Sequence, residues 1–172
     1  LDVDGVLVQY QRAQRVLHLA QALNVTADAV QAALYDSGLE AAHDSGALDG
    51  ATYLTRLGEQ LGRTVDAQTW TAARQAASHP QDAVLQRLEH LQVPLAVLTN
   101  NGALMVQALP QLLPGLFPAL HGRVFCSADF GLRKPQPAVF QRVLDVLQVA
   151  PAHTLFVDDL FANVRGARAA GL

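Results

Sequence analysis

Leu1-Asp2-Val3-Asp4-Gly5-Val6-Leu7 is the stretch that decides the fold. Two carboxylates alternate with apolar residues before a glycine interrupts the pattern, so Asp2 and Asp4 are predicted to point the same way at the end of a strand. Two like charges this close repel each other unless a cation or a shared proton offsets the repulsion. A metal site is therefore one interpretation, and a polar strand end followed by an Asp-Gly turn is the other.

The composition indicates a soluble globular protein. The 172 residues are 51% hydrophobic and 16% charged, and a chain of this length forms one domain with a sizeable core, or a core that carries a smaller insert. The net charge is only -3 and the twelve lysines and arginines are scattered, so we expect no nucleic-acid partner. No apolar run approaches the roughly 18 residues that a membrane span needs, so we expect no membrane partner.

The single cysteine and the two ends of the chain carry further expectations. Cys126 cannot form an internal disulfide, which suits a reducing compartment and predicts a cytoplasmic protein. The sequence opens at Leu1 without the apolar residues expected before such a strand end, and it stops at Leu172 just beyond a helix end. We therefore expect residues to be missing from both ends. The sequence predicts no particular oligomeric state.

Residues 12–79 are predicted to form an all-helical insert. No segment from Gln11 to His79 alternates like a strand, and Thr26 is a plausible N-cap. A second helix is predicted from about Thr52 to Leu61, between glycines that end helices. The apolar residues expected on one face of the first helix are Ala13, Val16, Leu17, Ala20 and Leu23.

Residues 1–11 and 80–172 are predicted to form an α/β core, because helical and strand patterns alternate there. Strands are predicted at residues 95–98, 123–127 (the weaker candidate) and 154–157. Three helices are predicted: one with Val84, Leu85, Leu88 and Leu91 on one face, a second with Val139, Phe140, Val143, Leu144 and Leu147 on one face, and a third that follows Asp159 and ends at about Ala170. Prolines 135 and 137 suit the first turn of the second of these helices. Such alternation implies a parallel sheet that is covered on both faces.

Polar residues follow the apolar strands of this predicted core. They are Asp2 with Asp4, Thr99 with Asn100, and Asp158 with Asp159, and Lys134 joins them from the loop before a helix. In an open α/β sheet the ligand site lies at the carboxyl ends of the strands, so these residues are predicted to share one cleft. Two like charges about 4 Å apart repel by roughly 4 kcal/mol at an effective dielectric near 20. Such a cluster needs a cation, and its oxygen donors favour Mg²⁺ over Zn²⁺.

These groups are the parts that phosphoryl transfer requires. Asp2 is the candidate nucleophile, which would form an aspartyl phosphate. Asp4 is the candidate general acid and base. Thr99 Oγ and the Asn100 amide would hold phosphate oxygens, while Mg²⁺ and Lys134 would cancel the repulsion between an anionic nucleophile and an anionic phosphate.

The ordered motifs resemble those of haloacid dehalogenase (HAD) superfamily phosphatases. They are Asp2-Val3-Asp4-Gly5-Val6, Thr99 after an apolar strand, Arg133-Lys134-Pro135, and Asp158-Asp159 with Asn163-Val164-Arg165-Gly166-Ala167. The helical insert is similar to the first cap class (C1) of that superfamily, which implies a Rossmann-like core. The stretch 127–171 looks most like members that act on sugar phosphates and like the N-terminal domains of some epoxide hydrolases.

The resemblance also implies roles for single residues. Asp2, the Asp4 carbonyl and Asp159 would touch Mg²⁺ directly, Asp158 would act through a water, and Asn163 would support the last loop. Halide-releasing members lack the second aspartate of the first motif, so the presence of Asp4 favours a phosphatase. The expected partner is a small phosphorylated metabolite.

Two alternatives stay open at the level of the sequence. A phosphosugar mutase would pass the phosphoryl group to a second hydroxyl rather than to water, and nothing in the insert separates it from a phosphatase. A catalytically degenerate HAD-like module kept for regulation or partner binding is the other. A response-regulator receiver is disfavoured, because the segment before Thr99 has no acceptor aspartate and a receiver has no large insert.

Each residue also has a purely structural interpretation. Thr99 could cap the helix that follows, Lys134 could be a solvated charge, and Asp158-Asp159 could cap a helix. Within the insert, three polar residues are candidates for substrate specificity, but polar residues on a helical cap are usually just solvated: Glu40, His43 and Arg74. Its aromatic residues, Tyr35, Tyr53 and Trp70, are predicted to form the core of the insert, and Cys126 is predicted to be buried and inert.

Overall fold

The computed structural model describes residues 1–117 and 119–172. A short parallel pair forms its centre, in which β3 (Val97–Thr99) lies beside β4 (Val124–Cys126) with Val97 opposite Val124. The first residues of the chain extend this hydrogen bonding, because Leu1 accepts a bond from the Leu98 N–H at 2.9 Å. Asp2 in turn donates its N–H to the Val157 carbonyl at 2.9 Å. Leu1 and Asp2 therefore lie between β3 and the segment 154–157, and this order places the first and last motifs side by side.

The prediction of a strand at residues 154–157 is wrong. The segment is extended, but within the described residues its only backbone bond to the centre of the fold is the one that Val157 accepts from Asp2. Leu155 is 84% exposed and Val157 is 38% exposed. An apolar alternating pattern forms a strand only where neighbours pair with it, and nothing in the described part of the chain pairs with the outer side of this segment. The predicted strands at 95–98 and 123–127 are observed as β3 and β4.

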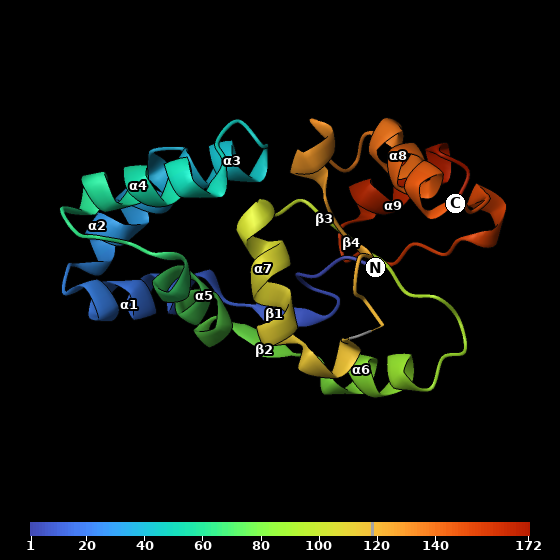
Figure 1. Ribbon diagram of the computed structural model, residues 1–172, viewed down its shortest axis with the longest axis horizontal. Coiled ribbons are helices and arrows are strands. Elements are labelled where there is room, and N and C mark those ends of the chain that lie inside the picture. The colour runs from blue at the N-terminus through green and yellow to red at the C-terminus, as the bar shows by residue number, and fades with distance from the viewer. Residues whose placement is uncertain (118) are drawn as a thin grey trace.

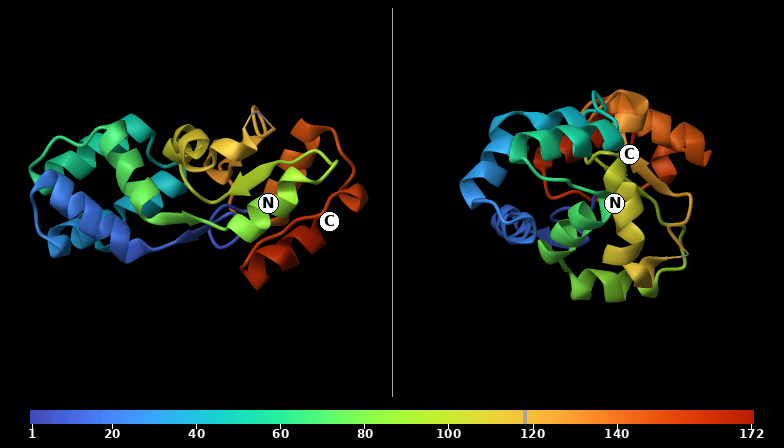
Figure 2. Two further views of the ribbon diagram at one scale, coloured as in Figure 1. Left: turned by 90° about the horizontal axis from the view of Figure 1, so that it is seen from below. Right: turned by 60° about the vertical axis from the view of Figure 1, so that its left-hand side comes forward.

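A two-stranded antiparallel ribbon joins the insert to the core. β1 (Val8–Tyr10) pairs with β2 (Ser78–Pro80), with Val8 opposite Pro80. The expectation that no segment from Gln11 to His79 forms a strand is therefore wrong for Ser78 and His79, which belong to β2. This strand forms by pairing with residues some 70 positions away, so its own sequence shows no alternating pattern. The chain between the two strands folds into α1 (Arg12–Leu23), α2 (Ala27–Gln31), the π-helical turn η1 (Ala32–Asp36), α3 (Leu39–Asp44), α4 (Gly50–Leu61) and α5 (Ala67–Ala76). These helices gather at one end of the molecule (Figures 1 and 2).

Local signals in the sequence account for several of these helices. The Thr26 hydroxyl accepts a hydrogen bond from the Ala29 N–H at 3.2 Å, which confirms the predicted N-cap of α2. Asp49 and Asp66 cap α4 and α5 in the same way, each at 2.7 Å. Tyr53 and Trp70 are buried in the insert as predicted, with 0% and 3% exposure.

The remaining helices are α6 (Asp82–Glu89), α7 (Ala103–Leu112), α8 (Pro137–Leu147) and α9 (Phe161–Ala169), with short 3-10 turns η2 (Pro114–Leu116), η3 (Ser127–Phe130) and η4 (Pro151–His153). Helices α8 and α9 lie at the end opposite the insert (Figure 1) and pack with Leu98 in an apolar cluster. A second, larger cluster runs from the insert into α7, against which α5 packs. None of the described helices has the length and apolar character needed to cross a bilayer.

The division into a core of residues 1–11 and 80–172 and a helical cap of residues 12–79 remains our proposal. The β1–β2 ribbon lies at both of its boundaries. Together with the parallel pair and the flanking helices, the arrangement is an α/β fold with an inserted set of helices.

Candidate active site

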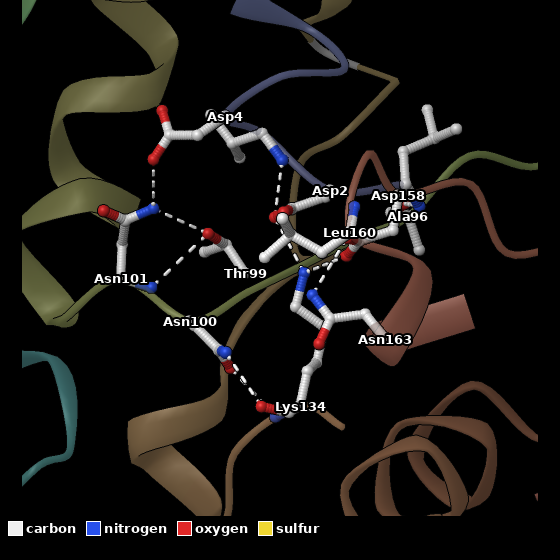
Figure 3. Close-up of polar contacts among 12 residues, drawn as sticks. Asp2, Asp4, Ala96, Thr99, Asn100, Asn101, Lys134, Asp158, Leu160 and Asn163 are labelled. Atoms are coloured by element: carbon white, nitrogen blue, oxygen red, sulfur yellow. Dashed lines mark hydrogen bonds and ion pairs between the residues drawn. The ribbon is translucent and has the colours of Figure 1, made fainter. Parts of the chain in front are cut away.

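Lys134 and two aspartates form the centre of the site. Lys134 Nζ lies 2.9 Å from Asp2 Oδ1 and 2.7 Å from Asp158 Oδ2, and the lysine side chain is fully buried (Figure 3). A buried ammonium is tolerated only when it is paired and hydrogen-bonded. Burial raises the pKa of Asp2 to about 6, although the lysine opposes this rise. The structural alternative of a solvated Lys134 is therefore excluded by its burial.

The loop before α9 fixes Asp158. Its Oδ1 accepts hydrogen bonds from the Leu160 N–H and from Asn163 Nδ2, both at 2.9 Å (Figure 3). Burial alone would raise the pKa of Asp158, but Lys134 and these donors outweigh it and hold the pKa below its usual value. Asn163 is 3% exposed, so the structure places it where it can orient the carboxylate.

Three carboxylates come together beside this lysine. Single oxygens of Asp2, Asp158 and Asp159 all lie within 4.8 Å of one another. Gly5 makes the approach of Asp159 possible, because a Cβ on Gly5 would lie 2.4 Å from the Asp159 carboxyl group and its φ is +81°. Three carboxylates against one ammonium leave an excess of negative charge, so this oxygen set suits a hard divalent cation. The side chain of Asp4 lies outside the cluster.

Asp4 is held from two sides. One of its oxygens pairs with Arg74 of α5, and the other accepts a hydrogen bond from Asn101 Nδ2 at 3.0 Å. The same Asn101 amide group donates to Thr99 Oγ1 at 2.7 Å (Figure 3). Thr99 is the last residue of β3. It has no exposed surface, yet it is one of the residues around the cavity described below.

The side chain of Asn100 joins two loops. Its Oδ1 accepts the Lys134 N–H at 2.9 Å, and its Nδ2 donates to the Lys134 carbonyl at 3.1 Å. This paired bond sets the position of the loop that carries the lysine (Figure 3). The side-chain amide of Asn100 is thus committed to that loop.

A polar cavity of about 490 Å³ opens over these groups. Its lining contains the predicted site residues Asp2, Asp4, Thr99, Asn100, Asp159 and Asn163, and in addition Gly5, Gln9, Tyr10, Asp44, Asn101, Arg133 and Leu160. A second cavity of about 490 Å³ lies beside α6 and η2 and contains none of the predicted site residues. The polar cavity is lined by Asp2, Asp4 and Asp159, while the buried Lys134 and Asp158 lie behind Asp2 and do not line it, and it is the candidate active site.

The structure corrects the interpretation of the three polar residues of the insert as solvated, because all three are buried: Glu40, His43 and Arg74. None of Glu40, His43 and Arg74 lines the polar cavity. Glu40 pairs with Arg15 in the interior of the insert, and the Tyr53 hydroxyl donates to it. His43 is 2% exposed, with Nδ1 3.1 Å from the Leu48 carbonyl oxygen, and Arg74 is committed to Asp4.

Sequence reasoning missed other residues of the cavity. Asp44 is the last residue of α3, and its Oδ1 accepts the Gly102 N–H at 2.9 Å. Burial, together with the nearby charge of Glu40, raises the pKa of Asp44 to about 7. No local pattern could reveal this contact, because its partners are 58 positions apart. Asn101 lies in the polar stretch that follows β3, in which the sequence predicts roles only for Thr99 and Asn100.

The chain is similar in sequence to proteins of known name. A protein named Phosphatase MT3486, from Mycobacterium tuberculosis (strain CDC 1551 / Oshkosh), is 37% identical over 78 residues, which are 45% of this chain and 36% of that protein. The aligned part thus spans about a third of that relative's length. The activity of the whole relative is therefore a basis for proposals only.

Two solved structures share the fold. The HAD family enzyme bt-2542 from Bacteroides thetaiotaomicron, crystallised with magnesium and inorganic phosphate, gives a TM-score of 0.78 at 18% identity, covering 99% of this chain and 88% of that chain. The L-2-haloacid dehalogenase from Xanthobacter autotrophicus gives 0.65 at 23% identity, covering 99% and 72%.

The match that decides the family covers nearly the whole sequence. Residues 1–171 match the family of haloacid dehalogenase-like hydrolases. The ordered motifs and the shared fold point the same way, and this protein therefore belongs to the haloacid dehalogenase-like hydrolases.

Proposed function

We propose that this protein is a Mg²⁺-dependent phosphatase of small phosphorylated metabolites, with sugar phosphates as one candidate class. The observation that carries the proposal is the buried Asp2–Lys134–Asp158 arrangement beside Asp159, next to a cavity that is lined by Asp2, Asp4 and Asp159. The name of the mycobacterial relative and the magnesium and phosphate in the bt-2542 structure support it.

The oxygen donors at the base of the cavity fit Mg²⁺. By the family resemblance, Asp2, Asp159 and the Asp4 carbonyl would hold the ion directly, and Asp158 would do so through a water. The close approach of Asp159 over Gly5 and the excess of negative charge are features of this chain that suit a hard cation. When bound, the ion would supply the positive charge that lets two anions, the nucleophile and the phosphate, meet.

The chain's own residues would carry the two chemical steps. A carboxylate oxygen of Asp2 attacks phosphorus, the bond between phosphorus and the leaving oxygen breaks, and Asp4 gives that oxygen a proton. Water then attacks the phosphorus of the aspartyl phosphate, Asp4 takes the proton, and inorganic phosphate leaves with Asp2 restored. Lys134 lies 2.9 Å from Asp2, and it would hold this carboxylate in place and supply positive charge, while Thr99 would hold a phosphoryl oxygen.

The helical cap, residues 12–79, would exclude bulk water and select the leaving group. It contributes Asp44 to the cavity, and Tyr10 of the ribbon lies in the same wall. A closed, dry site strengthens every electrostatic interaction within it. The presence of Asp4 separates this site from the halide-releasing members of the superfamily, in which the resemblance implies no need to protonate a leaving oxygen.

Hydrolysis of 4-nitrophenyl phosphate tests the proposal. We expect turnover by the full chain with Mg²⁺, none with excess chelator, and at least about a 10³-fold loss of kcat in Asp2→Asn. Asp145→Asn is the matched control, because Asp145 is an exposed aspartate on α8, and it should keep wild-type kcat.

Two results would contradict the proposal. Asp2→Asn protein that keeps turnover would exclude the aspartyl phosphate. A folded wild-type chain that binds Mg²⁺ but turns over neither 4-nitrophenyl phosphate nor a panel of sugar phosphates would favour the non-catalytic module. Phosphorus NMR on the sugar phosphates separates hydrolysis, which releases inorganic phosphate, from the transfer that a mutase would carry out.

A further inference from the structure

Arg74 reaches out of the insert to the core. It lies in the last turn of α5, its side chain is only 3% exposed, and its guanidinium pairs with the carboxylate of Asp4, 70 residues away in the sequence. A buried guanidinium on a residue of the catalytic motif cannot be an incidental surface pair, because exposed pairs of long side chains contribute little and are readily lost to water. The contact therefore needs an explanation of its own.

The ring of Tyr10 holds the guanidinium in place. Arg74 Cζ lies 4.0 Å from the centre of this ring, which belongs to β1, and the Tyr10 hydroxyl is 2.8 Å from that of Tyr35. A cation stacked on an aromatic face has little freedom to turn. The guanidinium thus presents a fixed donor to Asp4.

The two oxygens of Asp4 are fixed by different parts of the molecule. Arg74 of the insert holds one, and Asn101 of the core holds the other at 3.0 Å. The side chain of Asp4 is still 30% exposed, and Asp4 lines the cavity. Removing one donor would leave the carboxylate held at a single oxygen and able to take more than one orientation, whereas the two together hold one orientation.

We propose that Arg74 is a positioning residue, which orients Asp4 for proton transfer to the leaving oxygen. The proposal rests on the proposed function, since it assumes that Asp4 is the general acid. A direct role in binding phosphate is a poorer explanation, because Arg74 does not line the cavity. A purely structural link between α5 and the core is the alternative that an experiment must separate.

The acidity of the leaving alcohol distinguishes a positioning role of Arg74 from a purely structural one. A general acid matters most for a poor leaving group, and little for one that departs without a proton. We compare kcat/KM for ethyl phosphate and 4-nitrophenyl phosphate in wild type, Arg74→Met and Arg74→Lys, with Mg²⁺ present. Arg74→Met should lose about 100-fold on ethyl phosphate and no more than about 3-fold on 4-nitrophenyl phosphate. Arg74→Lys should recover part of the loss, and Arg56→Met, at an exposed arginine of α4, should lose nothing.

A double-mutant cycle completes the test. If Arg74 acts only through Asp4, then Arg74→Met should cause no further loss of kcat/KM on ethyl phosphate in an Asp4→Asn background. Asn101→Ala removes the other donor and should show the same dependence on the leaving group, which keeps the proposal open to test if Arg74→Met does not fold.

An equal loss on both substrates, or an additive loss in the Asp4→Asn background, would overturn the positioning role in favour of a structural one. Failure of the proposed function gives a different result, because the wild type would then release phosphate from neither substrate or Asp2→Asn would retain activity. The proposal about Arg74 would fall with it in that case.

Discussion

The helical insert and the candidate active site each bury an arginine or lysine with carboxylates, but they differ in charge balance and in access. In the insert, Arg15 pairs with Glu40, and the Tyr53 hydroxyl donates to the same carboxylate, so one cation meets one anion. In the candidate active site, Lys134 pairs with two carboxylates, those of Asp2 and Asp158, a third carboxylate lies beside them, and Asp2 lines a cavity of about 490 Å³. Buried charge alone therefore does not mark a functional site. Unbalanced charge beside a cavity does, because only there does a ligand have something to neutralise.

Replacing Lys134 should have the largest effect. In Lys134→Met, Asp2 loses the ammonium that opposes its charge, and a phosphate loses a cation, so we expect kcat/KM for 4-nitrophenyl phosphate to fall about 10³-fold. Arg142→Met, at an exposed position of α8, is the control and should stay within twofold of wild type. A loss of less than tenfold in Lys134→Met would show that the lysine serves structure, like Arg15, and would remove the contrast between the two regions.

Breaking the pair in the insert should act on stability instead. Glu40→Gln leaves the Arg15 guanidinium buried without its counter-ion, so we expect the free energy of unfolding in urea to fall by about 3–5 kcal/mol. Replacing both partners, as Arg15→Met with Glu40→Leu, should recover most of this loss. A fall below about 1 kcal/mol for Glu40→Gln would contradict a structural role for the pair.

Asp44 should give the smallest effect, and it depends on pH. Its pKa is raised from 3.8 to about 7, so the folded state binds its proton more tightly than the unfolded state. The free energy of unfolding of the wild type therefore falls progressively as pH rises from about 4 to about 7, and the loss is complete above that range. Asp44→Asn retains an acceptor for Gly102 but carries no charge. Its Tm should exceed that of wild type by about 2–4 °C near pH 8, with the gap narrowing toward pH 4.5. A Tm difference that does not change with pH would show that the charge of Asp44 is not its cause.

The sequence predicted features that depend on local order. The Thr26 cap and the burial of Tyr53 and Trp70 follow from residue type and helical period, and both are observed. The polar residues that follow the predicted strands were expected to share one cleft with Lys134. The structure brings Asp2, Lys134 and Asp158 within hydrogen-bonding distance.

The features that sequence reasoning missed depend on contacts between distant segments. Strand β2 forms because Ser78–Pro80 pairs with β1, and the segment 154–157 does not form a strand because only one side of it finds a partner. Glu40 and Arg74 were candidates for substrate specificity, with solvated positions as the favoured interpretation, and both are buried. Their actual partners, Arg15 and Asp4, are 25 and 70 positions away, and no periodicity encodes such a pairing.

The β1–β2 ribbon has a consequence for how this fold varies. The chain leaves the core at Tyr10 and returns at Ser78, and these two residues are paired neighbours. The Gln81 N–H then donates to the Leu7 carbonyl at 2.9 Å, so the junction is closed on the core side as well. Because the two points of attachment are adjacent, the insert does not pull the core apart, and the length of the insert does not affect the geometry of the core. Modules of different size could therefore be grafted onto the same junction during evolution or design, provided that each supplies a side chain to do for Asp4 what Arg74 does here.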